Sequence, residues 1–321
     1  MKKVLVISTG GTIASEKTDD GKLTSGTLKG EQIINLCGLS KDEFNIEIIE
    51  LFNLPSMHID IHKMQELSLL INEKIRDETI AGIVITHGTD SLEETSYFLN
   101  LTIDSDKPVI VTGSQRSLSD VGSDVYSNLR NSIICATDEH MQNTGVTVVF
   151  NERIYSARYI KKIHSSNLQG FDSLGRGYLG IVDNDTVYLY QKPIKEKTLN
   201  VKNVSIPYVD IVKTFAGQNG MVFEFLLGKD IEGIIIEGSG RGQVAANISD
   251  ILSKNTNHNT KIVIATSTEE GRVYPTYDYK GSANDLLSKG CIMGGDLDSK
   301  KARIKLSLLL ANGIEDIGLY F

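Results

Sequence analysis

Three short turns combine threonine, serine and glycine residues, whose hydroxyl groups and permissive backbones suit catalysis or ligand binding. The turns read TGGTIAS, THGTDS and TGSQR, and they begin at Thr9, Thr86 and Thr112. Each directly follows a short apolar run that is typical of a buried β-strand. In an open parallel sheet, ligands bind beyond the carboxyl ends of the strands. We therefore expect the three turns to meet at one edge of a sheet and to form a site there.

The first turn offers a candidate nucleophile. Gly10 and Gly11 permit a tight turn and let a ligand approach the backbone, which would leave Thr12 projecting into the crevice. Taken alone, a glycine pair after a first strand is often only a turn or a phosphate cradle, and Thr12 would more often be structural. The phosphate alternative is weakened because neither GxGxxG nor GxxxxGK followed by Ser or Thr occurs in this turn.

The second turn predicts the start of a helix. Ser91 and Glu94 have the spacing of a capping box, which would place Thr89 and Asp90 at a helix N-terminus. Free backbone N–H groups at such an end can hold an anion or a developing oxyanion. The plain alternatives are a simple helix cap, an Asp90 that only favours the helix dipole, and a buried, hydrogen-bonded His87. The convergence of three such turns favours a site.

Composition excludes several classes of function. The chain has 321 residues with 40% hydrophobic and 23% charged side chains, and no apolar run approaches the roughly 20 residues that span a bilayer. A net charge of −8 without a basic stripe makes nucleic acid a poor partner. The three cysteines are far apart and lack metal-binding spacing, so we expect a cytoplasmic protein without disulfides, metal or other cofactor.

The pattern along the chain predicts an α/β fold. Short apolar runs alternate with helix-period segments, which indicates a parallel sheet flanked by helices. Apolar residues recur on one helical face over 61–75, whereas glycine-rich turns and alternation over 155–190 predict hairpins, so the sheet is mixed but mainly parallel. The runs expected to form strands are residues 4–7, 82–85, 109–111, 146–150, 233–236 and 262–265.

A division into two domains is expected from the length and from a change in composition. Residues 191–207 are polar and lysine-rich and lie between two prolines, so we place a linker there. The N-terminal domain would then cover residues 1–190, and a smaller α/β domain with a parallel sheet would cover 208–321. The second domain is predicted to end in a helix over 302–310 that stops at Asn312 and Gly313.

TGGTIAS and VITHGTDSLEET together resemble the two signature sequences of the bacterial-type L-asparaginase family, which includes glutaminase-asparaginases. The resemblance covers essentially the whole chain. It continues, in the order of the family, through PVIVTGSQR, the basic stretch at 158–162, GSGRG at 238–242, and GGDLDSKKARIKLSLLLANG at 294–313.

The resemblance implies an amidohydrolase in which Thr12 attacks the side-chain amide of L-asparagine and forms an acyl-enzyme. It also implies that Thr89, Asp90 and Lys162 form a supporting triad that activates a nucleophile. A threonine hydroxyl needs a base to take its proton, and a lysine is a feasible base only where it is buried. The choice of Lys162 over Lys161 rests on the motif alignment alone.

The resemblance further implies a set of substrate contacts. Ser56, with Asp90, would hold the α-carboxylate and α-ammonium groups, and the backbone at Ser114 would meet the leaving amide. Gln243 stands where an asparagine from a neighbouring subunit often completes the site, so a homodimer or homotetramer is expected. The predicted substrate-binding residues are Gly11, Ser56, Met57, Gly88, Ser114 and Gln243.

Some positions depart from the family pattern. Met57 replaces a common glutamine beside the substrate-holding serine, and Gln243 replaces the asparagine, which bears on selectivity for side-chain length. Residues 16–29 directly follow the expected nucleophile and contain small polar residues and glycines, so we expect a lid there, although a plain loop is the alternative. This segment lacks the tyrosine that many members supply.

Several other functions compete with asparagine hydrolysis. Glutamine is the nearest alternative substrate, because one methylene separates substrates by only about 1–3 kcal/mol in such a pocket. A transfer-RNA-dependent amidotransferase subunit would be expected to carry an extra N-terminal domain, whereas the first strand here begins at Val4. A non-catalytic amino-acid sensor on the same fold is an alternative from another class. The retention of all four predicted catalytic residues argues against the sensor.

Overall fold

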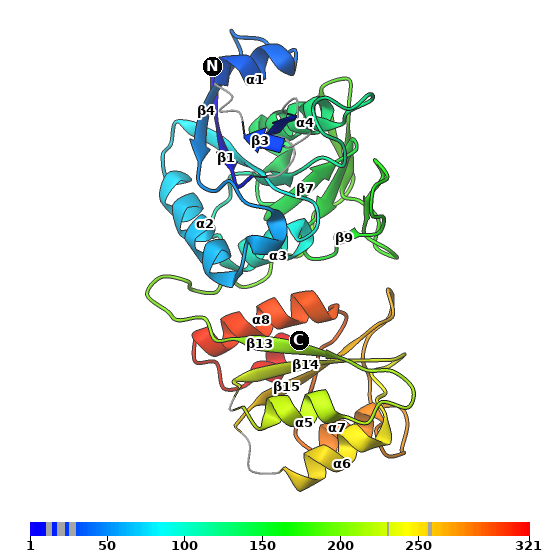
Figure 1. The fold of residues 1–321 in the computed structure, drawn as a ribbon. Coiled ribbons are helices and arrows are strands. Elements are labelled where there is room, and N and C mark those ends of the chain that lie inside the picture. The colour runs from blue at the N-terminus through cyan, green and yellow to red at the C-terminus, as the bar shows by residue number, and fades with distance from the viewer. Residues whose placement is uncertain (11–14, 18–22, 26–29, 230, 256–258) are drawn as a thin grey trace. The chain divides into compact units, whose positions relative to one another are not determined.

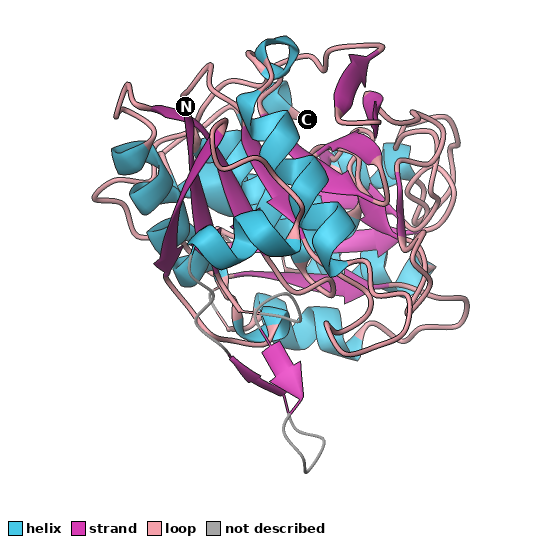
Figure 2. Cartoon of the chain, turned by 90° about the horizontal axis from the view of Figure 1, so that it is seen from above, coloured by secondary structure: helices cyan, strands magenta, loops and turns pink. Residues whose placement is uncertain are grey.

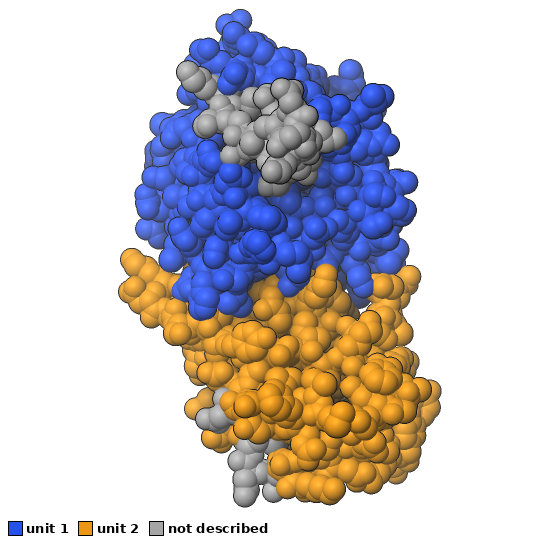
Figure 3. All heavy atoms as spheres, in the orientation of Figure 1, with its two compact units in different colours: residues 1–198 blue, residues 199–321 orange. Residues whose placement is uncertain are grey.

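The computed structural model describes residues 1–10, 15–17, 23–25, 30–229, 231–255 and 259–321. The chain divides into two compact units, Met1–Thr198 and Leu199–Phe321, coloured separately in Figure 3. The division falls within residues 191–207, where the sequence predicts a linker. Each unit is described by itself below.

The first unit is built on an eight-stranded sheet (Figure 1). Five neighbouring strands run parallel, and three antiparallel strands extend the sheet at one edge. In spatial order the strands are β12 (Thr186–Leu189), β11 (Gly180–Asp183), β8 (Arg153–Ser156), β7 (Val146–Phe150), β6 (Val109–Thr112), β5 (Ile80–Thr86), β1 (Lys2–Ser8) and β4 (Phe44–Glu50). The predicted mixed, mainly parallel sheet is confirmed.

Helices cover both faces of this sheet. Side chains alternate between the faces of a strand, and Val4, Val6 and Val84 share one buried cluster with residues of α1 (Gly30–Leu36) and α4 (Val125–Thr137). On the opposite face, α3 (Leu92–Thr102) packs against β6 and β7, and α2 (Ile61–Lys74) lies beside α3.

Helix α2 confirms the helix predicted over residues 61–75. Its first turn is capped by Asp60, whose carboxylate accepts a hydrogen bond from Lys63 N at 2.9 Å. Met64, Leu67 and Ile71 form its buried face, as the sequence period requires.

Hairpins occupy the region where the sequence predicts them. Strands β11 and β12 are joined by Asn184 and Asp185, which both have positive φ angles, as a tight two-residue hairpin turn requires. A separate two-stranded sheet pairs β9 (Lys161–Lys162) with β10 (Phe171–Asp172). A further hairpin of β2 (Ser15–Lys17) and β3 (Leu23–Ser25) extends away from the other strands in Figure 2.

The second unit is a smaller α/β domain, as predicted. Its four strands are parallel, in the order β13 (Val209–Lys213), β14 (Gly233–Gly238), β15 (Lys261–Thr266) and β16 (Ile292–Met293). Apolar residues of α5 (Met221–Leu227), α6 (Ala246–Lys254) and α7 (Ala283–Ser288) pack with the strands in one core cluster, and α8 (Ser299–Ala311) also packs on β13, β14 and β15.

The last long helix ends where the sequence predicts. Helix α8 is capped at its C-terminus by Asn312, and the following Gly313 has a φ angle of 63°. Among the described residues, no helix has both the length and the apolar character needed to cross a bilayer.

Candidate active site

The described residues of the three hydroxyl-rich turns begin side by side at the carboxyl edge of the first unit's sheet, as predicted. They follow β1, β5 and β6, which are neighbours in the sheet. Thr9 donates hydrogen bonds from its backbone N–H and its Oγ1 to the Thr86 carbonyl, at 3.1 and 3.0 Å. His87 N donates to the Thr112 carbonyl at 2.8 Å. The strand pairing therefore continues into the turns and holds them together.

Three of the four predicted catalytic side chains meet at this edge. Lys162 Nζ lies 2.8 Å from Thr89 Oγ1 and 2.6 Å from Asp90 Oδ1. The lysine comes from β9, 72 residues along the chain from Asp90. A proton can pass between hydroxyl and amine at such distances. The contacts are consistent with the choice of Lys162, although the roles of these residues stay predictions.

The lysine and the aspartate of this group differ in exposure. The side chain of Lys162 is 14% exposed, whereas that of Asp90 is 65% exposed. The ammonium group donates to both the hydroxyl and the carboxylate, so it is held between them. Desolvation therefore falls mainly on the amine, while the carboxylate stays in contact with solvent.

His87 is buried beneath the second turn, which confirms the plain alternative for this residue. Its Nδ1 lies 2.8 Å from the Gly88 carbonyl, and its Nε2 lies 2.9 Å from Thr95 Oγ1. A carbonyl only accepts, so Nδ1 carries the proton and Nε2 accepts from the threonine hydroxyl. Burial lowers the pKa of His87 to about 4. The neutral ring therefore supports the backbone immediately before Thr89.

The predicted capping box at Ser91 is wrong. Ser91 is the N-cap residue of α3, but its side chain makes no capping hydrogen bond. Its Oγ instead donates to the Ser56 carbonyl at 2.6 Å. The spacing of Ser91 and Glu94 matches the motif, but the Ser91 hydroxyl forms a tertiary hydrogen bond in place of the capping one.

The same contact brings the Ser56 segment to the second turn. Ser56 is buried and begins a short 3-10 helix, Ser56–His58. A Cβ atom on Gly88 would lie 2.9 Å from Ser56 Cβ, so this close approach requires glycine. Met57, next to Ser56, is 68% exposed. The structure thus brings together Ser56 and Gly88, two of the predicted substrate-binding residues.

The third turn also lies against the second. A Cβ atom on Gly113 would lie 3.4 Å from Thr89 Cγ2, and the adjacent Ser114 is buried, with its Oγ making no hydrogen bond within the described structure. Asp124 holds the turn, because its carboxylate accepts from the backbone N–H groups of Gln115 and Arg116, both at 3.0 Å.

Sequence reasoning missed two residues with buried carboxylates at this site, Asp124 and Glu93. The carboxylate of Glu93 accepts a hydrogen bond from Lys162 N at 2.6 Å. Glu93 lies three positions after Asp90 in the first turn of α3. That position alone suggested only a favourable interaction with the helix dipole.

Two predicted site residues lie outside the described residues, namely Thr12 and Gly11. The preceding Gly10 is described and has a φ angle of 104°. A Cβ atom there would lie 2.5 Å from the backbone of Leu54, so only glycine fits. Of the expected lid, residues 16–29, the structure describes only 16–17 in β2 and 23–25 in β3.

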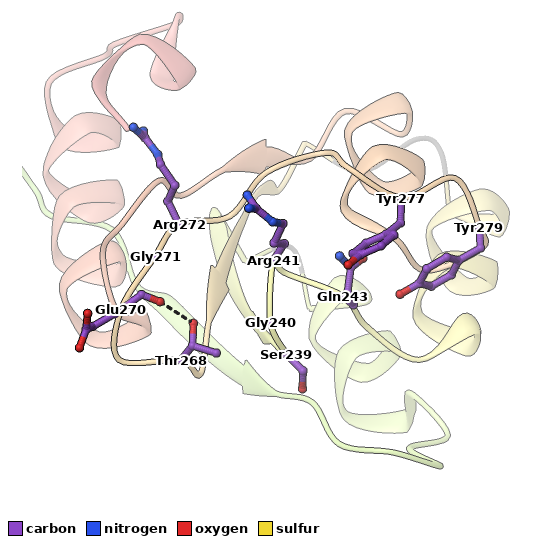
Figure 4. A pocket seen from close by; sticks show the side chains of 10 residues that line it. All are labelled: Ser239, Gly240, Arg241, Gln243, Thr268, Glu270, Gly271, Arg272, Tyr277 and Tyr279. Atoms are coloured by element: carbon purple, nitrogen blue, oxygen red, sulfur yellow. Dashed lines mark hydrogen bonds between the residues drawn. The ribbon is translucent and has the colours of Figure 1, made fainter. Parts of the chain in front are cut away.

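Gln243, the last predicted site residue, belongs to the second unit. It lines a cavity of about 700 Å³ with Arg241, Glu270 and Arg272 (Figure 4). Its Oε1 accepts a hydrogen bond from Ala283 N at 3.0 Å, at the start of α7. Within the described parts of the chain, no group of three or more His, Cys, Asp or Glu side chains is placed to hold a metal ion.

Comparison with protein families identifies matches along nearly the whole chain. Residues 3–195 match the family described as "Asparaginase, N-terminal", and residues 208–318 match "Glutaminase/Asparaginase C-terminal domain". The two matched ranges are separated by 196–207, within the stretch expected to be a linker.

Individual relatives and a solved structure agree with these matches. The chain is 49% identical over 318 residues to the L-asparaginase of Bacillus licheniformis, covering 98% of each protein. It is 33% identical to L-asparaginase 2 of Bacillus subtilis, covering 100% of this chain and 86% of that protein. It is also similar to the crystal structure of a probable cytoplasmic L-asparaginase from Campylobacter jejuni, with a TM-score of 0.86, 30% identity and full coverage of both chains.

Proposed function

This chain belongs to the asparaginase family, and from that premise we propose that it hydrolyses the side-chain amide of L-asparagine to L-aspartate and ammonia. The observation that carries the proposal is the contact of Lys162 Nζ with both Thr89 Oγ1 and Asp90 Oδ1. These groups lie at the edge of the sheet where Thr9 contacts Thr86 and His87 contacts Thr112, and Thr12 follows Gly10 by two positions in the sequence. The arrangement supplies a hydroxyl, an amine and a carboxylate for acyl transfer.

The proposed reaction has two steps. In the first, the Thr12 oxygen attacks the amide carbon, an O–C bond forms, and the C–N bond breaks. The hydroxyl proton is taken up by the array of Thr89, Lys162 and Asp90, and a proton is returned to the leaving nitrogen so that ammonia departs. In the second step, water attacks the ester and releases aspartate and the free Thr12 hydroxyl.

The proposed substrate contacts follow the geometry of the second turn. Ser56 and Asp90 would hold the charged α-substituents, since Ser56 packs against Gly88 and Asp90 follows two residues later. Ser114 would meet the leaving amide from the third turn. Gly11, Met57 and, from a neighbouring subunit, Gln243 would complete the pocket.

Ammonia release is the direct test of this function. Purified protein is incubated with L-asparagine and, separately, with L-glutamine, beside a Thr12→Ala variant. We expect release from asparagine that the variant abolishes, and the rate with glutamine measures selectivity. Binding of asparagine without ammonia release, by a folded protein, would contradict hydrolysis and favour the amino-acid sensor.

We also propose that the protein is a cytoplasmic homodimer or homotetramer. Cys37, Cys135 and Cys291 are buried and free, which fits a reducing compartment. The similar Campylobacter jejuni protein is named cytoplasmic. Light scattering after gel filtration would measure the assembly, and fractionation of the source cells would measure the location. A monomer at working concentration would contradict the proposed contribution of Gln243 to a neighbouring site.

A further inference from the structure

The strand that carries Lys162 is short. Strand β9 has only two residues, both of them half-buried lysines, and among the described strands it pairs only with β10. An isolated two-stranded hairpin is marginally stable in water. A contact to the backbone of this strand from the core would therefore help to hold a lysine that meets Thr89 and Asp90 within 3 Å.

The partner strand β10 is well fixed to the core. Phe171 is buried, and its ring lies 4.8 Å from that of Phe150. Its carbonyl accepts hydrogen bonds from Tyr155 Oη at 3.1 Å and from Gln169 Nε2 at 2.7 Å. These contacts hold one side of the hairpin, whereas Lys162 lies on the other.

Glu93 supplies the support on the side of β9 that faces away from β10. Ile163 N donates to the Gly170 carbonyl, so the preceding amide of Lys162 points in the opposite direction. That amide donates to Glu93 Oε2 at 2.6 Å. The Glu93 side chain is 2% exposed, so water does not replace it at this contact. Its carboxylate takes the place that a neighbouring strand would have.

The lysine is thereby attached to α3 at two points. Its backbone N–H contacts Glu93 in the first turn of the helix, and its Nζ contacts Thr89 and Asp90 just before that helix begins. All three partners belong to one segment of five residues, 89–93, which comprises the start of α3 and the turn before it. Fixing both ends of the side chain against one segment limits the positions that the amine can take.

We propose that Glu93 is a positioning residue that acts through Lys162, holding its backbone so that Nζ reaches Thr89. The inference rests on the proposed function for its kinetic consequence, but the attachment itself does not depend on the reaction. The competing explanation is that Glu93 only stabilises the N-terminus of α3 through its charge. The two explanations predict opposite orders for two conservative variants.

Glu93→Gln keeps the length of the side chain and an acceptor oxygen but loses the charge. Glu93→Asp keeps the charge in the first helical turn but is one methylene too short for the contact. We expect Glu93→Gln to lower kcat by about fivefold, because a charged hydrogen bond becomes a neutral one. We expect Glu93→Asp to lower kcat by about 100-fold, because a misplacement of the Lys162 amine by about 1 Å has an effect of this size. KM should change by less than about twofold.

A matched control is available at the next position. Glu94→Gln removes a charge from the same helical turn without touching Lys162 N, and we expect kcat to stay within about twofold of wild type. Thermal unfolding is measured for all variants. Hydrogen exchange at the Lys162 amide gives a readout independent of activity. We expect this exchange to be about tenfold faster or more in Glu93→Asp, but unchanged in Glu93→Gln and in the Glu94→Gln control.

The outcomes separate the alternatives. If Glu93→Asp keeps the wild-type kcat while Glu93→Gln loses it, the charge of Glu93 is what activity requires, and the positioning role is wrong. Equal kcat values in both Glu93 variants and the wild type would also overturn the positioning role. So would faster hydrogen exchange throughout the first unit of Glu93→Asp in place of a change confined to the β9–β10 hairpin. If the wild-type protein releases no ammonia, the proposed function fails, and exchange at Lys162 still decides whether Glu93 holds this strand.

Discussion

The two units place a lysine–carboxylate pair at the end of parallel strands in opposite ways. In the first unit, Lys162 is 14% exposed and its partner Asp90 is 65% exposed. In the second, Lys213 is 76% exposed and its partner Glu237 is 15% exposed, with Nζ 3.1 Å from Oε1. The lysine is therefore the more buried partner of the pair in the first unit, whereas the carboxylate is the more buried partner of the pair in the second.

The turns after β14 in the second unit and after β5 in the first unit also differ in their hydrogen-bond partners. After β14, the turn of the second unit closes on itself, because Ser239 and Gln243 exchange backbone hydrogen bonds of 2.8 Å in both directions. After β5, the turn of the first unit instead meets the β9–β10 hairpin through Lys162. In the first unit, the additional hairpin thus brings a lysine side chain to the carboxyl edge of the parallel sheet.

The largest effect is expected from removing the buried lysine. Lys162→Met should lower kcat for asparagine by about 1,000-fold, within the range for loss of a general base, whereas Lys213→Met should change it by less than about twofold. Ammonia release measures both, and Lys161→Met serves as the control within the same strand. Retention of more than a tenth of the activity in Lys162→Met would show that another group takes the proton.

Much of the fold follows from local patterns in the sequence. The strand at 82–85 and the helix at 61–75 were predictable because their apolar residues recur with the period of each element. Strand β4, FNIEIIE, was not singled out, since as an edge strand it buries only Ile46 fully. Strand β13 was missed too, where a short apolar pattern follows a polar stretch.

The candidate site was predictable only in part. Thr89, Asp90 and Lys162 were predicted because they lie in motifs that resemble a family, and their mutual contacts are consistent with that choice. Glu93 accepts a hydrogen bond from a backbone group 69 residues away in the sequence, and Asp124 accepts from backbone groups eight and nine residues before it. No spacing rule for helices, strands or turns signals such contacts. The Ser91 hydroxyl was misassigned for the same reason, because its acceptor is the carbonyl of Ser56.

The next largest effect is expected from His87, whose burial should make the first unit less stable at acidic pH. The pKa of His87, about 4 when folded and about 6.5 when unfolded, means that the unfolded chain binds the extra proton between these values. The free energy of unfolding should therefore fall as pH decreases from about 6.5 to 4, by roughly 3 kcal/mol from this residue. Urea unfolding of wild type and His87→Asn at pH 7 and pH 4.5 measures the difference.

The variant should lose less stability on acidification than the wild type. His140→Asn is the control, because that side chain is 65% exposed. Hydrogen exchange resolved by unit would show whether the acid effect lies in the first unit. An identical pH dependence in wild type and His87→Asn would mean that His87 is not held neutral.

A smaller loss is expected where a glycine permits close packing at the site. Gly88→Ala places a Cβ 2.9 Å from Ser56 Cβ, and the resulting displacement should lower kcat/KM about 100-fold. In the second unit, Gly290 has a φ angle of 83° and no atom near the position of a Cβ. Gly290→Ala should cost about 1 kcal/mol of stability without changing kcat/KM. Equal effects of the two variants on kcat/KM would contradict the packing argument.

The smallest effect tests whether the second unit takes part in binding at all. Gln243 Oε1 already accepts from Ala283 N, so Gln243→Ala should cost about 1 kcal/mol of stability in any case. If its side chain also completes the site of a neighbouring subunit, KM for asparagine should rise about fivefold, with kcat little changed, because only ground-state binding is lost. Steady-state kinetics and urea unfolding separate the two contributions. An unchanged KM in an intact oligomer would restrict Gln243 to its structural role, and the contrast between the two units would then extend from the burial of the lysine to substrate binding.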